Sequence, residues 1–305
     1  MTAPCVLWLI HDGKAGHRSQ LEGLRAALAE RVQLAAHWLE PLAPVRAAWD
    51  CARGHTRLGA TLPAPHFIVV AGHRTHWSGL AARRARGGRL IALMQPSLPL
   101  SWFDAAIVPE HDQCPPRPNV LRTAGVLNPM HPASKTPGSA IVLLGGESRH
   151  FGWSDEAVLT VLDHLRIAWP QLIVADSRRT PLSLRAALAE RYPQIWQAWE
   201  DCPPGWLAAT LAHTETAWIT ADSVSMVYEA LSAGCATALI PLPPAPRPSK
   251  LARSIVRLIQ NGQVSDFATW HRGYPLHAAA TPLAEAARTA DWLLARFPSA
   301  TWSAR

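Results

Sequence analysis

Residues Ala217–Leu242 read AWITADSVSMVYEALSAGCATALIPL, and this stretch decides the fold. It predicts a short strand, a tight turn with Asp222 and Ser223, a helix over about 224–233 and a second buried strand. Asp and Ser are favoured just before a helix, and Gly234 supplies the left-handed stop after it. A helix that joins two parallel strands is the core of a βαβ unit. The sequence therefore predicts an α/β fold built on a parallel sheet.

The same stretch predicts an anion site. Its helix begins at the carboxyl end of a strand, where unpaired backbone N–H groups and the helix dipole favour phosphate. Glu229 lies about one turn into the helix and can direct its carboxylate toward that end. A phosphate site beside a carboxylate that can accept hydrogen bonds from hydroxyl groups is the pattern of a nucleotide site. The plainer alternative is an ordinary α/β turn with Glu229 as a solvated helix residue.

Composition limits the class of protein. The chain has 305 residues, enough for two domains, and 49% of them are hydrophobic, as in a globular protein. Its net charge of +7 favours an anionic partner such as a nucleotide or an anionic lipid surface. It has no run of five or six basic residues, so a nucleic-acid partner is not expected.

Cysteine usage and hydropathy predict a location. The five cysteines are odd in number, widely spaced and form no C-x-x-C pair, which favours free thiols in a reducing cytoplasm and no zinc site. We find no signal-peptide pattern and no window of about 18 apolar residues. We therefore expect a cytoplasmic protein. Fourteen tryptophans and the basic charge allow peripheral contact with the inner face of the cytoplasmic membrane.

A strand–loop–helix pattern recurs along the chain. Strands are predicted at 5–10, 35–39, 66–70, 89–94, 105–108, near 120, 140–144, 172–175 and from 217, and helices at 19–31, 45–57, 77–86, 154–168, 181–191, 224–233, 250–260 and 283–296. The proline-rich residues 127–139 predict a linker. We expect two Rossmann-like, doubly wound domains that face each other across a cleft, at 1–130 and 138–280, followed by a helix and tail at 281–305.

Two loops of the second half carry groups suited to a diphosphate. Gly145 and Gly146 let the backbone approach a ligand closely, although glycines at strand ends also serve turns. The loop Ser177-Arg178-Arg179-Thr180 offers two guanidinium groups at a strand end. An exposed arginine pair is the alternative, but arginines at a helix start are unfavourable for the dipole unless they bind an anion.

One loop of the first half carries a candidate base. Residues 12–17 read Asp-Gly-Lys-Ala-Gly-His after the first strand. Histidine is a natural general base near neutral pH, so His17 is a candidate, and Asp12 competes for the same role. The alternative is a simple turn with a surface histidine. The loops that contain Arg74 and His111 line the facing edge or are purely structural.

Several motifs are absent from the sequence. No G-x-G-x-x-G follows the first strand and no G-x-x-x-x-G-K-[ST] occurs, which disfavours a dinucleotide site and a P-loop. No Asp-x-Asp is present to hold a divalent ion. We therefore expect no metal and no bound cofactor, with a leaving diphosphate neutralised by helix termini and arginines.

Five motifs taken together resemble the bacterial family named mitochondrial fission ELM1, whose members are regarded as glycosyltransferases. These motifs are Asp12-Gly13-Lys14-x-Gly16-His17-x-x-Gln20-x-x-Gly23, Gln95-Pro96, Pro109-x-His111-Asp112, Ser177-Arg178-Arg179-Thr180-Pro181, and Thr220-Ala221-Asp222-Ser223-x-Ser225-Met226-x-x-Glu229-Ala230-x-x-x-Gly234. The second half is also similar to the UDP-binding domain of MurG-like GT-B glycosyltransferases. Two features depart from that pattern: the mixed first loop, and the pair Arg178-Arg179.

The resemblance implies roles for these residues. Glu229 would bind ribose hydroxyls, residues 223–226 would present N–H groups to the diphosphate, and His17 or Asp12 would be the catalytic base. Together with the loop that carries the two arginines, the expected donor-binding residues are Gly145, Gly146, Ser177, Arg178, Arg179, Thr180, Asp222, Ser223, Ser225, Met226 and Glu229. The implied acceptor-side residues are Lys14, Gly16, Gln20, Arg74, Gln95 and His111.

The expected function is transfer of a sugar from a nucleotide-diphosphate donor, UDP-linked or related, to a lipid or saccharide hydroxyl of the cell envelope, without metal. Two alternatives stay open at this point. One is a nucleotide-sugar epimerase on the same fold, which needs no acceptor. The other is a non-catalytic adaptor that binds a membrane or a protein partner.

Overall fold

The computed structural model describes residues 3–112, 114–149, 151–245 and 250–298; the side chains of His111, Lys250 and Leu251 lie outside the description. The chain divides into two compact units. The amino-terminal unit comprises residues 1–129 and 284–305, and the carboxyl-terminal unit comprises residues 130–283. The final helix therefore belongs to the first unit, whereas in the sequence analysis residues 281–305 are set apart from both domains as a helix and tail.

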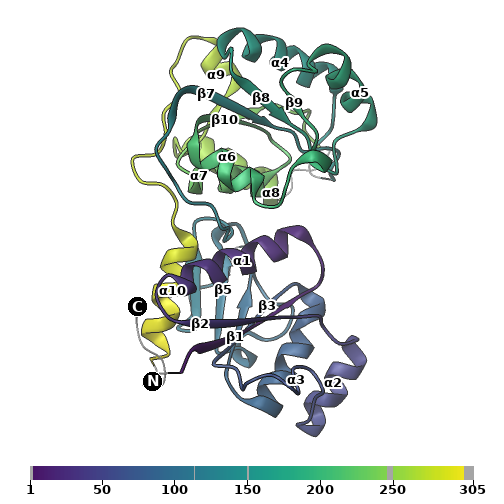
Figure 1. Ribbon diagram of the computed structural model, residues 1–305, viewed down its shortest axis with the longest axis vertical. Coiled ribbons are helices and arrows are strands. Elements are labelled where there is room, and N and C mark those ends of the chain that lie inside the picture. Colours follow the sequence, from purple (N-terminus) through teal and green to yellow (C-terminus); the bar gives the residue numbers. More distant parts are fainter. Residues whose placement is uncertain (1–2, 113, 150, 246–249, 299–305) are drawn as a thin grey trace. The chain divides into compact units, whose positions relative to one another are not determined.

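The amino-terminal unit is a parallel sheet with helices on both faces (Figure 1). Its described strands pair in the order β2-β1-β3-β4-β5-β6, and every pairing is parallel. In chain order the elements are β1 (Cys5–His11), α1 (Ala15–Ala29), β2 (Leu34–Leu39), α2 (Pro44–Arg53), β3 (Phe67–Ala71), η1 (His73–Thr75), α3 (His76–Arg86), β4 (Arg89–Leu93), η2 (Leu100–Trp102), β5 (Ala105–Pro109), η3 (Glu110–Asp112), β6 (Val120–Thr123) and α10 (Glu285–Arg296).

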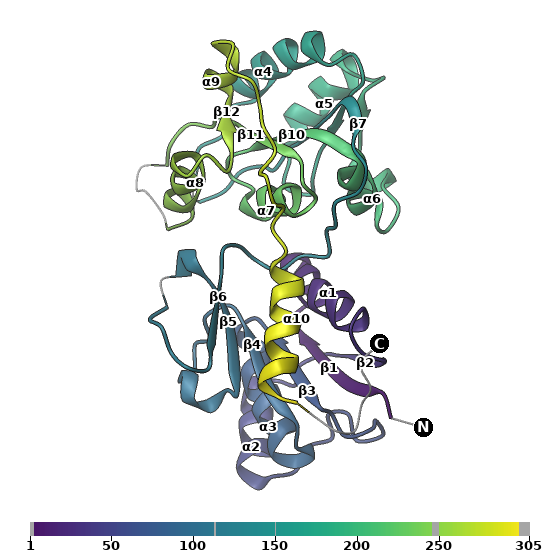
Figure 2. The ribbon, with the colours of Figure 1, turned by 90° about the vertical axis from the view of Figure 1, so that its left-hand side faces the viewer.

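The alternation of side chains along β1 builds the two cores of this unit. Leu7 and Leu9 point to the face covered by α1 and α10, and Trp8 and Ile10 point to the face covered by α3. A strand buried on both faces reads as a continuous apolar run, which is the pattern at residues 5–10. In Figure 2, α10 lies along α1 on one face of the sheet.

The carboxyl-terminal unit repeats this architecture. Its described strands pair in parallel in the order β12-β11-β10-β7-β8-β9. In chain order the elements are β7 (Thr136–Leu143), α4 (Asp155–Ala168), β8 (Leu172–Ala175), α5 (Leu182–Arg191), β9 (Trp196–Gln197), η4 (Trp199–Asp201), α6 (Trp206–His213), β10 (Thr214–Thr220), α7 (Val224–Ser232), β11 (Ala236–Ile240), α8 (Lys250–Gln260), β12 (Ser265–Asp266) and α9 (Phe267–His271). The predicted α/β class with two Rossmann-like domains is confirmed.

Several element boundaries differ from the sequence expectation, and for two helices the local cause is visible. Helix α1 begins at Ala15, because the Asp12 side chain accepts the Lys14 amide and closes a turn directly before it. Helix α2 ends at Arg53, because Gly54 adopts a left-handed conformation that stops it. Strand β7 begins at Thr136, inside the predicted linker.

The packing of α10 generates a stability prediction. Leu293 is fully buried among the side chains of α1 and the sheet, whereas the adjacent Leu294 is only partly buried. Replacement of a buried leucine by alanine removes apolar contacts and leaves a cavity. We expect Leu293→Ala to lower the free energy of unfolding by about 2–5 kcal/mol, measured by urea denaturation.

Leu294→Ala is the matched control and is expected to cost clearly less. Equal losses for the two variants would contradict the described docking of α10.

Candidate functional site

Three loops of the carboxyl-terminal unit lie side by side at the carboxyl edge of its sheet. Strand β7 lies between β10 and β8. The loops that follow these strands therefore emerge next to one another: Gly145-Gly146 after β7, residues 177–180 after β8, and Asp222-Ser223 after β10. In open parallel sheets this edge is where ligands bind.

Hydrogen bonds tie the Gly145-Gly146 loop to both neighbours. The Gly145 amide donates to Thr220 Oγ1 at 2.7 Å, and the Gly146 amide donates to Asp222 Oδ2 at 3.0 Å. A side chain at either position would meet a neighbouring loop: a Cβ on Gly145 would overlap the Asp222 carboxylate, and one on Gly146 would overlap the backbone of Arg179. These glycines are required by close approach within the protein itself.

Asp222 and Arg179 form an ion pair at the centre of this edge. The Asp222 side chain is 0% exposed, and its Oδ2 lies 2.7 Å from Arg179 Nη2. Arg179 also donates through Nη1 to the carbonyls of Gly146 and Glu147. A buried carboxylate needs such partners, because removal of its charge from water is costly. The Arg179 guanidinium therefore links all three loops.

The neighbouring residues of the β8 loop are also engaged. Thr180 Oγ1 donates to the carbonyl of Gly145 at 2.6 Å, and Ser177 Oγ donates to the same carbonyl at 3.0 Å. Arg178 is exposed and lies over the ring of Trp199, 5.3 Å from its centroid. Thr180 and Ser177 thus hold the loop together, while Arg178 points to η4.

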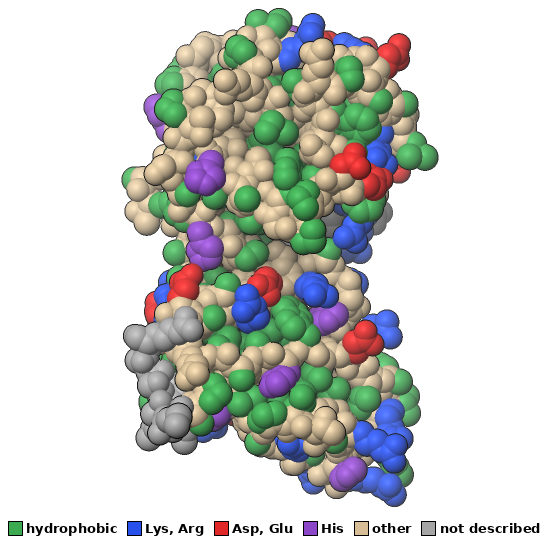
Figure 3. Space-filling view, viewed as in Figure 1, with side chains coloured by type: hydrophobic (Ala, Val, Ile, Leu, Met, Phe, Trp, Pro, Cys, Tyr) green, Lys and Arg blue, Asp and Glu red, His purple; other side chains and the backbone are tan. Residues whose placement is uncertain are grey.

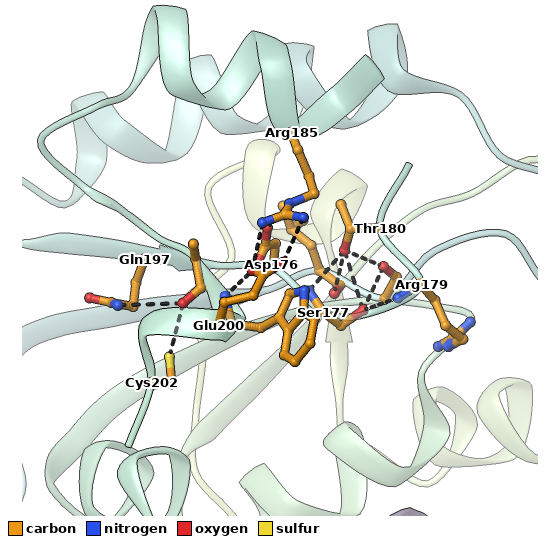
Figure 4. A network of polar contacts seen from close by, with 12 residues as sticks. Asp176, Ser177, Arg179, Thr180, Arg185, Gln197, Glu200 and Cys202 are labelled. Carbon is orange, nitrogen blue, oxygen red and sulfur yellow. Dashed lines mark hydrogen bonds and ion pairs between the residues drawn. The ribbon is translucent and has the colours of Figure 1, made fainter. Parts of the chain in front are cut away.

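A charged network behind this loop carries no signal in the sequence motifs (Figure 4). Asp176 is buried, accepts from Arg185 Nε at 2.7 Å and accepts the Trp199 amide at 2.7 Å. Arg185 forms a bidentate ion pair with Glu200, in which Nη1 and Nη2 donate to the two carboxylate oxygens. Burial is the largest influence on the pKa of Asp176 and raises it, although the Trp199 amide and the Arg185 charge oppose the shift. The network fixes the base of the loop on which Arg178 and Arg179 stand.

The start of helix α7 is left open by its own side chains. Ser223 occupies the N-cap position, but its side chain makes no capping hydrogen bond, and its amide donates to the Thr220 carbonyl. The first helical bond is donated by Val227, so residues 224–226 carry the initial amides that a helix leaves without intrahelical partners. Glu229 is half-buried and lies one turn beyond Ser225 on the same face.

The amino-terminal unit places Asp12 and His17 together at the carboxyl edge of its own sheet. His17 Nδ1 lies 2.7 Å from Asp12 Oδ1, and the Asp12 side chain is 3% exposed. Lys14 Nζ lies 3.8 Å from the other carboxylate oxygen. Gly72, at a φ of 97°, passes so close that a Cβ there would touch both Asp12 and His17. Asp12 and His17, which are alternative candidates for the general base in the sequence analysis, therefore form one hydrogen-bonded pair.

The state of Asp12 defines what His17 can do. Burial would raise the pKa of Asp12, but the hydrogen bonds from His17 and the Lys14 amide and the nearby charges outweigh it, so the pKa lies below 3.8. An ionised carboxylate can only accept, so it fixes the proton on His17 Nδ1. His17 Nε2 is then the nitrogen available to take a proton.

A pocket of about 480 Å³ opens beside this pair. It brings together residues from four strand-end loops: Lys14, His17, Gly72, His73, His76, Leu93, Met94, Gln95, Pro96 and Asp112. Buried Gln20 does not line the pocket, but its Nε2 lies 3.6 Å from the sulfur of the lining residue Met94. Met94 has a positive φ of 66°, a strained backbone of the kind that clusters at functional sites.

His76 is a pocket residue that the motifs do not reveal. Burial, and then the charge of His73, lower its pKa to about 4, so it is neutral at neutral pH. Of the predicted acceptor-side residues, Lys14 and Gln95 line the pocket, and Gln20 lies behind the lining residue Met94. Gly16 lies in the first turn of α1 and Arg74 is exposed on η1. The His111 side chain lies outside the described residues.

A family profile described as mitochondrial fission ELM1 matches residues 15–297. The chain belongs to this family. No curated relative matches this ELM1-family chain. No group of three or more His, Cys, Asp or Glu side chains in the described part of the chain is placed to hold a metal ion.

Solved structures with 9–10% sequence identity share the fold. A UDP-GlcNAc 2-epimerase from Neisseria meningitidis bound to UDP-GlcNAc has a TM-score of 0.54, with 96% of this chain and 98% of that chain covered. S. aureus MnaA in complex with UDP has a TM-score of 0.52, with 96% of each chain covered. A further UDP-N-acetylglucosamine 2-epimerase gives the same TM-score and coverage. These likenesses establish the two-domain GT-B type of fold for this ELM1-family chain.

The Asp12–His17 pair generates a pH prediction for the ELM1-family chain. Because the pKa of Asp12 is lowered by folding, its charge adds stability above pH 3.8 that is lost as the pH falls through the folded-state value. We expect wild-type protein to exceed Asp12→Asn in free energy of unfolding near neutral pH. The difference should narrow as the pH falls below about 4.

Urea denaturation of both proteins between pH 7 and pH 3 measures this difference. A gap that stays constant over the whole range would show that the Asp12 charge is not stabilised by its partners.

Proposed function

We propose that this protein is a glycosyltransferase that moves a sugar from a nucleotide-diphosphate donor to an acceptor hydroxyl. The observation that carries the proposal is the open start of helix α7 beside the Gly145-Gly146 loop at the carboxyl edge of a parallel sheet. Amides and a helix dipole at such a place favour a diphosphate. Two solved structures of the same fold, described above, contain UDP or UDP-GlcNAc.

In this proposal the carboxyl-terminal unit binds the donor. The amides of Val224, Ser225 and Met226 receive the diphosphate, and Glu229, on the outer face of the same helix, accepts the ribose hydroxyls. Asp222 does not touch the donor, because its carboxylate is buried and bound to Arg179 and the Gly146 amide. Arg179 instead adds positive charge near the diphosphate while it holds the loops in place.

The amino-terminal unit supplies the base. His17 Nε2 takes the proton of the acceptor hydroxyl as its oxygen forms a bond to the anomeric carbon. The bond from that carbon to the diphosphate oxygen breaks, and the nucleoside diphosphate leaves with the electron pair. Asp12 stabilises the protonated imidazole, because its Oδ1 already lies at hydrogen-bond distance, 2.7 Å, from His17 Nδ1. We propose a lipid or saccharide acceptor reached from the cytoplasm.

A nucleotide-sugar epimerase is the second candidate. The epimerases named above share the fold over nearly the whole chain, and such a reaction uses the donor site without an acceptor. Consumption of UDP-GlcNAc with no added acceptor, giving an epimeric nucleotide sugar, would select it. A non-catalytic adaptor would bind none of UDP, GDP, CMP and TDP in calorimetric titration.

The proposed role of His17 as the general base can be tested by substitution. We expect His17→Ala to lower turnover of UDP-GlcNAc, assayed with a membrane lipid extract as acceptor, by about 10²- to 10⁴-fold. Nucleotide affinity should remain, because the donor residues belong to the other unit.

The control is His213→Ala, which removes an exposed histidine of the carboxyl-terminal unit and should leave turnover unchanged. Full activity of His17→Ala would overturn the assignment of the base.

The donor site generates another prediction. We expect Glu229→Ala to weaken UDP binding by about 10- to 100-fold, the loss expected for a hydrogen bond to a charged group, measured by calorimetry. Binding of inorganic pyrophosphate should be unchanged, because it has no ribose.

Glu190→Ala, at an exposed glutamate on α5, is the matched control. An equal loss of affinity for UDP and for pyrophosphate would show that Glu229 does not bind the ribose.

A further inference from the structure

The positive charge of this protein is concentrated in one segment. Residues 43–88 contain seven arginines, one aspartate and no lysine or glutamate, a net charge of +6. The whole chain carries +7. The arginines do not form a run in the sequence, so the concentration becomes evident only when the segment is taken as a whole. It comprises α2, β3 and α3 of the amino-terminal unit.

Helix α2 turns an apolar face to solvent in the middle of this charge. Val45 is 85% exposed and Trp49 is 57% exposed, and their spacing of four residues puts them on the same side of the helix. The opposite side, with Ala47 and Asp50, is buried against the unit. Neither side chain belongs to the core clusters of the described residues, so most of the surface of each side chain faces solvent.

Exposed arginines lie at the carboxyl-terminal end of this face, whereas Arg46 and Arg83 of the same segment are paired with Asp50 and Asp104. The Arg53 guanidinium lies over the Trp49 ring, 4.8 Å from its centroid. At the end of α2, Gly54 lies so near Arg84 of α3 that a Cβ there would be 3.4 Å from Arg84 Nε. Arg57 is exposed in the loop that follows. Figure 3 shows blue side chains gathered over the corner formed by α2 and α3, next to green ones.

We propose that this α2 face docks on an anionic lipid bilayer. Tryptophan and a short aliphatic side chain insert at the boundary between headgroups and acyl chains, and arginines pair with anionic headgroups around them. The charge complementarity commits the surface to an anionic partner, and the apolar pair favours lipid over nucleic acid. No helix in the described part of the chain is long and apolar enough to cross a membrane, so the contact is peripheral.

Two apolar residues are too few to hold the protein by insertion alone. Each arginine near an anionic surface contributes about 1 kcal/mol, so electrostatics supplies most of the affinity. Binding should therefore weaken as salt rises, since the screening length shortens. Nucleotides are not part of this contact, so its failure and the failure of the proposed transferase activity are separate results.

The test is co-sedimentation of the full chain with vesicles of phosphatidylcholine, with and without phosphatidylglycerol. We expect binding only to the anionic vesicles. Arg53→Gln and Arg84→Gln should each weaken it about fivefold, and the double variant about 25-fold. Val45→Ser with Trp49→Ser should reduce binding to anionic vesicles but leave the thermal unfolding midpoint unchanged, because both positions are exposed.

The matched control changes two exposed aliphatic residues of the other unit, Ile167→Ser with Leu182→Ser, and should bind as wild type does. Equal binding to neutral vesicles, or equal loss in the control, would overturn the proposal. A third result would also overturn it: the wild-type protein fails to bind anionic vesicles but binds duplex DNA, and the Val45→Ser, Trp49→Ser double variant binds the DNA equally well.

Discussion

Burial of both faces of each parallel sheet is the constraint on which the rest of the structure depends. Strand β1 and residues 217–219 of β10 present apolar side chains that are buried on both faces, and polar side chains lie toward the strand ends. Chemistry is therefore confined to the loops at the strand ends. In both units the adjacent strands bring three or four such loops to one edge, and each candidate site is assembled there.

A buried carboxylate organises each of these edges. Asp222 draws the Gly146 amide and the Arg179 guanidinium inward, and Asp12 draws His17 and the Lys14 amide. In both units a glycine lies so close to the carboxylate that a Cβ atom would overlap it: Gly145 beside Asp222 and Gly72 beside Asp12. The removal of a charge from water forces neighbouring loops to supply donors, and those donors fix the loops in place.

The two edges differ in what they offer a ligand. The carboxyl-terminal unit offers backbone amides at the start of α7, which suits a fixed anion. The amino-terminal unit offers a pocket lined by His17, His73 and His76, of which His76 is held neutral by burial. In the proposed function, the first edge would bind the diphosphate and the second would accept a proton, so the two units would have different tasks.

The sequence by itself determined the class of fold, because the alternation of apolar strands, glycine loops and helices is a local pattern. It also located the strand-end loops with Asp12, His17, Gly145 and Asp222. It could not show that Asp222 pairs with Arg179 while Arg178 turns to Trp199, since two adjacent arginines look alike until the neighbouring loops are in place. The Asp176–Arg185–Glu200 network, the pocket position of His76 and the return of α10 to the first unit were decided only by tertiary structure. Each joins residues far apart in the chain, and long-range contacts leave no periodic trace in the sequence.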